Sequence, residues 1–126
     1  MESNQELIKN FYNSFKNKNK TYADFCHDDI EWITMDGMPN GGTYVGINAI
    51  FKEYFPKMLS NFQEFHAEPN VFLSDKDKVI VFGRYFGQSI SDKKFDVPFC
   101  HVYTIQNNKI IQFRQFTDTA IIQKSL

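Results

Sequence analysis

The sequence predicts a single α+β domain, in which a curved antiparallel sheet wraps around helices and leaves a conical pocket. Two long patterns of helical period lie in the first half of the chain, whereas the second half alternates like strands. Residues that bend or bulge strands recur in that second half, namely Pro69, Gly83, Gly87 and Pro98. A length of 126 residues suits one domain, which we place at 1–126.

The first helix is predicted to begin at Ser3, because Ser3 and Glu6 have the spacing of a capping box. Apolar residues then follow at helical spacing, namely Leu7, Ile8, Phe11, Tyr12 and Phe15. The helix is expected to end in the polar segment Lys16–Lys20. Thr21 can cap a second, short helix from Tyr22 to about His27.

A short strand is predicted over Ile30–Met35, with Ile30, Trp32 and Thr34 on one face. The segment Asp36–Gly46 contains four Gly and one Pro, so we expect an ordered loop without regular structure. Loops of this length in compact domains often bind ligands.

The strongest helical pattern runs from near Gly46 to Phe62, with a kink expected at Pro56 because proline lacks an N–H group. Four strands should follow. The first, Phe65–Ser74, is expected at an edge or bulged because it contains Pro69. The others are Lys78–Ile90, Phe95–Ile105 and Lys109–Thr117, the last two joined by a tight turn at Gln106-Asn107-Asn108.

The last hairpin carries the candidate site. Alternation places Phe95, Val97, Phe99, His101, Tyr103 and Ile105 on one face, and Ile111, Phe113, Gln115 and Thr117 on one face of the partner strand. His101 and Gln115 interrupt otherwise apolar faces, which makes the hairpin a candidate pocket wall. His101 is either a general acid or base, or a core histidine bonded to the protein.

Composition excludes several classes of function. The net charge is −1 and no basic face is concentrated, so nucleic acid is not an expected partner. No apolar run approaches the ~20 residues of a membrane span, and the polar N-terminus lacks a signal-peptide core, so we predict a cytoplasmic protein. Cys26 and Cys100 are not spaced as a metal motif, nor are the three histidines. We predict neither metal nor cofactor.

The order of elements, the segment TMDGMPNGGTYVGINAI (Thr34–Ile50) and the ending NKIIQFRQFTDTAII (Asn108–Ile122) resemble the SnoaL-like polyketide cyclase family. This family belongs to the nuclear transport factor 2-like superfamily, which includes ketosteroid isomerase and limonene epoxide hydrolase. The resemblance covers nearly the whole chain and implies a cystatin-like α+β barrel.

The resemblance also implies roles for particular residues. The cyclases take a proton next to a carbonyl with an Asp on the last strand, near a His on the preceding one. His101 occupies the His position, but Gln115 stands at the Asp position and cannot accept a proton. Asp118 matches the acidic residue that ends the last strand, so His101 and Asp118 are the candidate catalytic residues.

The machineries of the two other enzymes are not retained. The carboxylate base, the Tyr and the oxyanion-binding Asp of ketosteroid isomerase align with Ile33 or Thr34, Phe11 and Cys100. The epoxide hydrolase arginine matches Arg84, but its two carboxylates align with Phe86 and Gln115, which leaves no base to activate water.

Two functions therefore stay open. One is a cofactor-independent isomerase or cyclase that transfers a proton on an apolar carbonyl compound, and the other is a non-catalytic ligand-binding or dimerisation domain. The predicted ligand wall is Trp32, Arg84, Phe99, Phe113 and Gln115. We expect Trp32, His101 and Gln115 to converge on one apolar cavity, with Arg84 or Asp118 near its mouth. Arg84 can instead pair with Asp118 or Glu31 at a subunit contact.

The opposite face of the sheet predicts a homodimer. It carries Phe82, Arg84, Phe86, Val102, Arg114 and Phe116. Apolar rings and arginines in this number are rarely bare on a monomer, and members of the superfamily commonly pair through this face.

Overall fold

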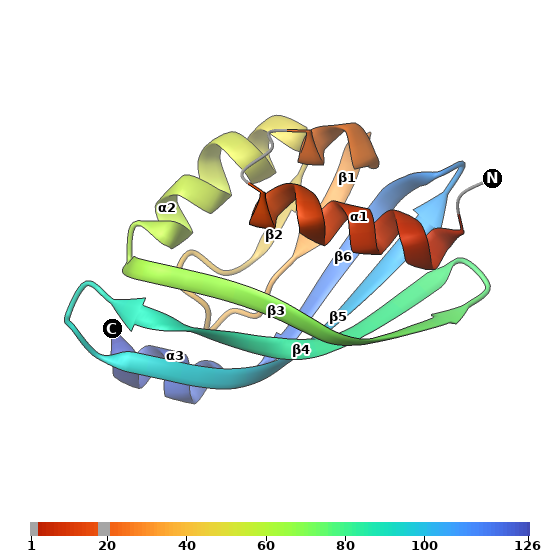
Figure 1. Cartoon of the computed structure of the whole chain (residues 1–126). Coiled ribbons are helices and arrows are strands. Elements are labelled where there is room, and N and C mark those ends of the chain that lie inside the picture. The colour runs from red at the N-terminus through yellow and green to blue at the C-terminus, as the bar shows by residue number, and fades with distance from the viewer. Residues whose placement is uncertain (1–2, 18–20) are drawn as a thin grey trace.

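The structure, a computed structural model, describes residues 3–17 and 21–126. It is a mixed α+β fold in which a curved, unclosed sheet of six strands lies against helices (Figure 1). The strand order is β2-β1-β6-β5-β4-β3, so β2 and β3 form the two edges. All neighbouring strands are antiparallel except β1 and β6, which run parallel, so the predicted sheet is antiparallel with this one exception.

Helix α1 spans Asn4–Lys16 and begins as predicted, since the Ser3 Oγ accepts the Glu6 N–H at 3.1 Å. Its buried face includes Leu7, Ile8 and Phe11. The predicted polar segment after α1 continues into residues 18–20, which lie outside the described residues. The second helix is a 3₁₀ helix, η1 (Tyr22–Phe25), and ends two residues before the predicted boundary.

Strand β1 spans Cys26–Ile33, so it begins and ends earlier than the predicted strand. The prediction of a wholly irregular loop after it is wrong, because Thr43–Val45 form strand β2 against β1. β-branched and aromatic residues favour this extended backbone. The loop is also fastened to β1 by the Thr34 Oγ1, which accepts the Gly42 N–H at 3.0 Å.

Where we predicted one helix with a kink near Pro56, the chain forms a π-helix, η2 (Ala49–Tyr54), followed directly by α2 (Phe55–Leu59). Pro56 lies in the first turn of α2 and has no N–H to donate to the preceding turn, and just before it the Phe55 N–H bonds to the Ile50 carbonyl, five residues back. Ile50, Phe51, Tyr54 and Met58 are buried, so the segment packs on the core as predicted.

Four long strands complete the sheet: β3 (Phe62–Asp75), β4 (Lys78–Ser89), β5 (Lys94–Gln106) and β6 (Lys109–Thr117). The predicted edge position of β3 is confirmed, and its register shifts between Pro69 and Val71. Asn107 and Asn108 have φ of 52° and 60°, as a two-residue turn with left-handed backbone requires.

Gly83 allows the sheet to bend. A Cβ at Gly83 would lie 2.2 Å from the Glu68 carbonyl oxygen and 2.5 Å from the Phe99 ring. No residue with a side chain fits there unless β3 or Phe99 moves. The glycine therefore lets β3 and an inward-facing ring close on β4 from two sides.

Two further features differ from the prediction. The register between β5 and β6 shifts after Thr104, so Ile110 is fully buried and Ile111 only partly, the reverse of simple alternation. The chain also continues from β6 into α3 (Thr119–Ser125), whose Ile122 is fully buried. None of the described helices has the length and apolar character needed to cross a membrane.

Candidate functional site

The polar centre of the fold is His101, which lies on β5 directly opposite Gln115 on β6. Its side chain is 4% exposed. The Tyr12 hydroxyl, from α1, lies 2.6 Å from the His101 Nδ1, and the Tyr85 hydroxyl, from β4, hydrogen bonds to the Nε2. Both ring nitrogens thus have a tyrosine partner.

Gln115 extends this network to the edge of the core. Its Nε2 donates to the Tyr85 hydroxyl at 2.8 Å, and its Oε1 accepts the Met35 backbone N–H at 3.4 Å. Met35 follows the end of β1, where pairing between β1 and β6 stops after Ile33 and Arg114. The Gln115 side chain therefore bridges the gap in which backbone hydrogen bonds no longer join the two strands.

Aromatic rings surround the network. The Phe99 ring stacks on His101 with centroids 3.9 Å apart, and Phe113 lies edge-on at 4.7 Å. Trp32 in turn stacks on Phe113 at 3.8 Å. The structure thus brings together Trp32, Phe99, His101, Phe113 and Gln115, all predicted site residues.

The expectation that these residues line one open cavity is wrong. Trp32, His101 and Gln115 are buried, and the space between them is occupied by their own rings and by Tyr12, Tyr85 and Tyr103. The physical reason is the aromatic content of the chain, because tyrosine side chains from α1 and β4 reach the centre of the fold.

Burial keeps the network neutral. Removal from water lowers the pKa of His101 to about 3, and it raises the pKa values of Tyr12 and Tyr85 well above the usual value for tyrosine. At neutral pH the imidazole is therefore uncharged and a weak base. The site offers hydrogen bonds without net charge.

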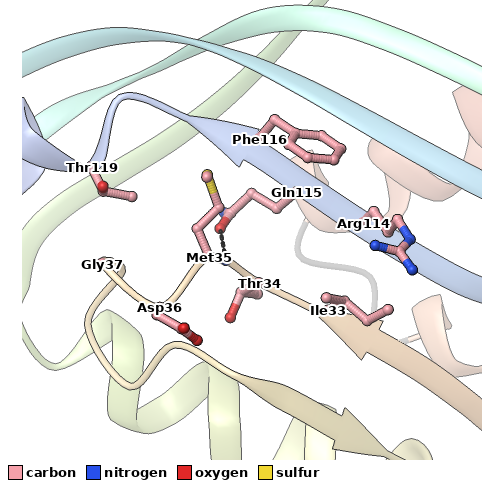
Figure 2. A pocket seen from close by; sticks show the side chains of 9 residues that line it. All are labelled: Ile33, Thr34, Met35, Asp36, Gly37, Arg114, Gln115, Phe116 and Thr119. Carbon is pink, nitrogen blue, oxygen red and sulfur yellow. Dashed lines mark hydrogen bonds between the residues drawn. The ribbon is translucent and has the colours of Figure 1, made fainter.

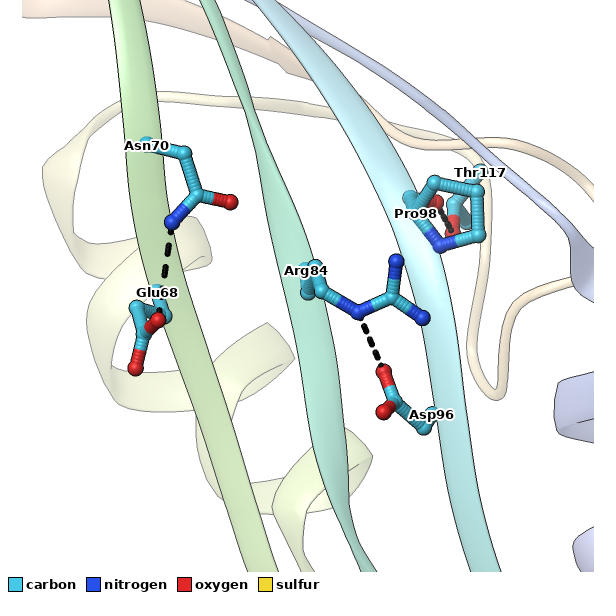
Figure 3. Close-up of polar contacts among 6 residues, drawn as sticks. All are labelled: Glu68, Asn70, Arg84, Asp96, Pro98 and Thr117. Carbon is cyan, nitrogen blue, oxygen red and sulfur yellow. Dashed lines mark hydrogen bonds and ion pairs between the residues drawn. The ribbon is translucent and has the colours of Figure 1, made fainter.

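The other two predicted site residues lie elsewhere. Arg84 is on the outer face of β4, where its Nε donates to the Asp96 Oδ1 at 2.6 Å (Figure 3). Successive residues of a strand point to opposite faces, so Tyr85 faces inward and Arg84 cannot. The predicted position near a cavity mouth is wrong for Arg84, which pairs with Asp96 within the chain.

Asp118 caps a helix. It is exposed, and its Oδ1 accepts the Ile121 N–H at 3.2 Å at the start of α3. A short helix after β6 was not foreseen, and it gives this carboxylate a structural partner.

A surface hollow of about 420 Å³ lies where β1 and β6 separate (Figure 2). Gln115 is the member of the network that reaches it, and Asp36 and Gly37 of the predicted loop lie beside it. The lining residues are Ile33, Thr34, Met35, Asp36, Gly37, Arg114, Gln115, Phe116 and Thr119.

The sequence analysis missed Tyr12 and Tyr85 as members of the site. Tyr12 was assigned to the apolar stripe of the first helix, where a tyrosine looks like any other ring, and Tyr85 was not singled out. A signal was nevertheless present, because a buried tyrosine hydroxyl needs a hydrogen-bond partner and His101 and Gln115 were the polar residues facing inward. Over residues 3–17 and 21–126, no group of three His, Cys, Asp or Glu side chains is arranged to hold a metal ion.

A curved, unclosed sheet lying against helices is the fold of nuclear transport factor 2-like proteins. The SnoaL-like domain family matches residues 8–113, most of the chain. The chain belongs to this family. No curated protein matches it.

Solved structures of the same class superpose closely. A nuclear transport factor 2-like protein from Burkholderia thailandensis is 25% identical with a TM-score of 0.93, covering 99% of this chain and 98% of its own. TerC, co-crystallised with polyporic acid, is 25% identical with a TM-score of 0.88 and covers 95% of both chains. A putative SnoaL-like polyketide cyclase from Jannaschia sp. is 15% identical with a TM-score of 0.81, covering 99% and 95%, and shares the fold.

Proposed function

We propose that this SnoaL-like domain binds a small, largely apolar molecule that carries a carbonyl or hydroxyl oxygen. The observation that carries the proposal is the neutral network of Tyr12, His101, Tyr85 and Gln115 inside a wall of aromatic rings. Apolar surroundings with a few convergent polar groups are the usual composition of a small-molecule site.

Three further features support this proposal. The network has no net charge, so an uncharged ligand can share it without bringing an unpaired ion into the core. The hollow beside Gln115 gives a ligand an approach to one end of the network. TerC, a relative of the same fold, was crystallised with a small organic molecule.

Trp32 is the sole tryptophan and stacks on Phe113, so its fluorescence reports on the core around His101. We expect cyclic ketones or phenols to change this fluorescence with saturable dependence on concentration. Tyr12→Phe removes one hydroxyl and keeps the ring, and should weaken binding about tenfold, the loss of one hydrogen bond worth about 1.4 kcal/mol.

Tyr44→Phe is the matched control, because the Tyr44 hydroxyl donates to the Asn40 carbonyl outside the network. It should leave binding unchanged. A flat fluorescence signal across the whole panel, or equal losses in both variants, would contradict the proposed binding site.

The second candidate function is proton transfer, as in a cofactor-independent isomerase or cyclase, with His101 and Asp118 as its acid–base residues. The continuous hydrogen-bonded path Tyr12–His101–Tyr85 favours it, since a proton can pass along such a path. The lowered pKa of His101 and the capping role of Asp118 weigh against it. Deuterium uptake by the same ketones in D₂O, lost in His101→Gln, would favour the enzyme over a binding domain.

We also propose a homodimer formed through the outer face of the sheet. Two adjacent rows of side chains cross this face, in register from strand to strand. We call them together the outer band; they are Val71, Phe82, Cys100 and Phe116, and Leu73, Ile80, Val102, Arg114 and Ile33.

Four members of the outer band, Val71, Leu73, Phe82 and Phe116, are between 45% and 51% exposed. A contiguous apolar patch of this kind is typical of an interaction surface. A second copy suits it because the band crosses β3, β4, β5, β6 and β1 and is bordered by the Arg84–Asp96 pair, which can make polar contacts at a rim (Figure 3).

Light scattering at micromolar concentration is expected to give the mass of a dimer. Phe82→Glu should shift it to the monomer, because two charges would be buried near the centre of the interface. Leu59→Glu is the control, since Leu59 is similarly exposed at 41% but lies on α2. A monomer mass for the wild type would overturn the proposed dimer.

A further inference from the structure

We infer that Gln115 is a positioning residue that sets the direction of hydrogen bonding through the buried network, so that His101 carries its proton on Nδ1. The consequence of this proton position for ligands rests on the proposed binding function and deepens it, because the network then selects ligands with an acceptor oxygen. The tautomer itself is independent of any ligand.

The inference begins from the donors and acceptors of a neutral imidazole, which has one N–H and one bare nitrogen. Tyr12 and Tyr85 each hydrogen bond to one ring nitrogen of His101. One tyrosine must therefore donate to the ring while the other accepts from it. The two arrangements use the same atoms and differ only in direction.

The Gln115 amide chooses between them. The Met35 N–H needs an acceptor, which turns the Oε1 of Gln115 toward β1 and its NH₂ toward Tyr85. The Tyr85 oxygen consequently accepts from Gln115. Among the described residues, this hydroxyl hydrogen bonds to Gln115 and to the His101 Nε2, so the hydroxyl proton goes to Nε2.

The rest of the network follows from this step. An Nε2 that accepts leaves the imidazole proton on Nδ1, which donates to the Tyr12 oxygen. The Tyr12 hydroxyl proton then points away from the imidazole ring. Tyr12 is also the half-buried member of the network, whereas His101, Tyr85 and Gln115 are buried.

The network therefore presents a donor at the half-buried Tyr12, at the opposite end from the hollow beside Gln115. A ketone or quinone carbonyl can accept the Tyr12 hydroxyl proton, and its aromatic or alicyclic body suits the surrounding rings. A carboxylate at position 115 would accept from Tyr85 and reverse every bond, so that Tyr12 donates to Nδ1 and can only accept from a ligand. The amide is thus a determinant of specificity.

Long-range ¹H–¹⁵N correlation of the histidine side chains in the full chain at pH 9 tests the tautomer. We expect the Nδ1–H form for His101. His27 is an internal reference for the other form, because its Nδ1 accepts the Asp29 N–H and its proton must be on Nε2. An Nε2–H form of His101 in the wild type would overturn the inference without bearing on whether the domain binds ligands.

Gln115→Glu tests the role of the amide at the same pH. It is expected to convert His101 to the Nε2–H form, whereas Gln112→Glu on the same strand should not. Retention of the Nδ1–H form with an ionised carboxylate would overturn the assigned role of Gln115. If the glutamate variant does not fold, the wild-type spectrum still decides the tautomer.

Acetophenone and 1-phenylethanol test the specificity. The wild type should bind the ketone more tightly than the alcohol, and Gln115→Glu should shift the ratio of dissociation constants about tenfold toward the alcohol. An unchanged ratio beside a reversed tautomer would refute the ligand part alone. Absence of binding by both compounds would count against the ligand class.

Discussion

Replacement of Phe113 by alanine is expected to lower the free energy of unfolding by about 3–5 kcal/mol, because it removes a ring from the centre of the core. Phe113 is 2% exposed and contacts Trp32, His101 and Tyr103 through its ring. The cavity left by the Phe113 ring would lie between Trp32 and the polar network. Neither Trp32 nor the hydrogen-bonded side chains can move into it without losing their present contacts.

Urea unfolding followed by circular dichroism measures this effect. Phe86→Ala is the matched control, since Phe86 is 36% exposed on the outer face and should cost below about 1 kcal/mol. Equal destabilisation by the two substitutions would contradict the placement of Phe113 at the centre of the core.

The second large effect is a loss of stability in acid that depends on His101. Its folded-state pKa is about 3 because of burial, whereas the unfolded chain has the ordinary value of 6.5. Between these values the unfolded state binds a proton that the folded state does not. Stability is therefore fully present above pH 6.5 and falls by about 1.4 kcal/mol per unit as the pH decreases toward 3.

The comparison with His101→Gln isolates this contribution, because glutamine keeps a donor and an acceptor but does not titrate in this range. Carboxylates elsewhere titrate equally in both proteins. The wild type should lose stability more steeply than the variant from pH 6 to 4, by about 1.4 kcal/mol for each unit. Parallel pH profiles would show that His101 is not held neutral by the fold.

Much of the site could be predicted from alternation alone. His101 and Gln115 were expected on inward faces of paired strands, and the structure places them directly opposite each other. Trp32, Phe99 and Phe113 were likewise expected inside. These residues lie in long strands where a period of two persists, and that period fixes which face a side chain occupies.

The hydrogen-bond partners could not be predicted in the same way. Tyr12 and His101 are 89 positions apart, and a helix must cross the sheet at one angle for the two to meet. Ile111 was misplaced because a bulge after Thr104 adds one residue to β6. Helix α3 was missed because its seven residues are too few to show a helical period.

Arg84 illustrates a different failure. Its neighbours Phe82 and Phe86 suggested a ligand wall, but all three share the outer face, and Asp96 already compensates the charge of Arg84. The predicted dimer surface placed Arg84 on the outer face correctly, and the error was to assign the same side chain to the ligand wall as well.

The parallel pairing of β1 with β6 has a consequence for how the chain reaches this structure. Short turns connect β3 to β4, β4 to β5 and β5 to β6, so each of these pairs can form by closing a short loop. The contact between Ile33 and Arg114 closes the chain between those positions, and its entropic cost is repaid only after β6 is in place. Until residues 109–117 are available, β1 lacks its neighbour β6. The last long strand in the chain is therefore the one that connects the β2–β1 pair to β5, β4 and β3.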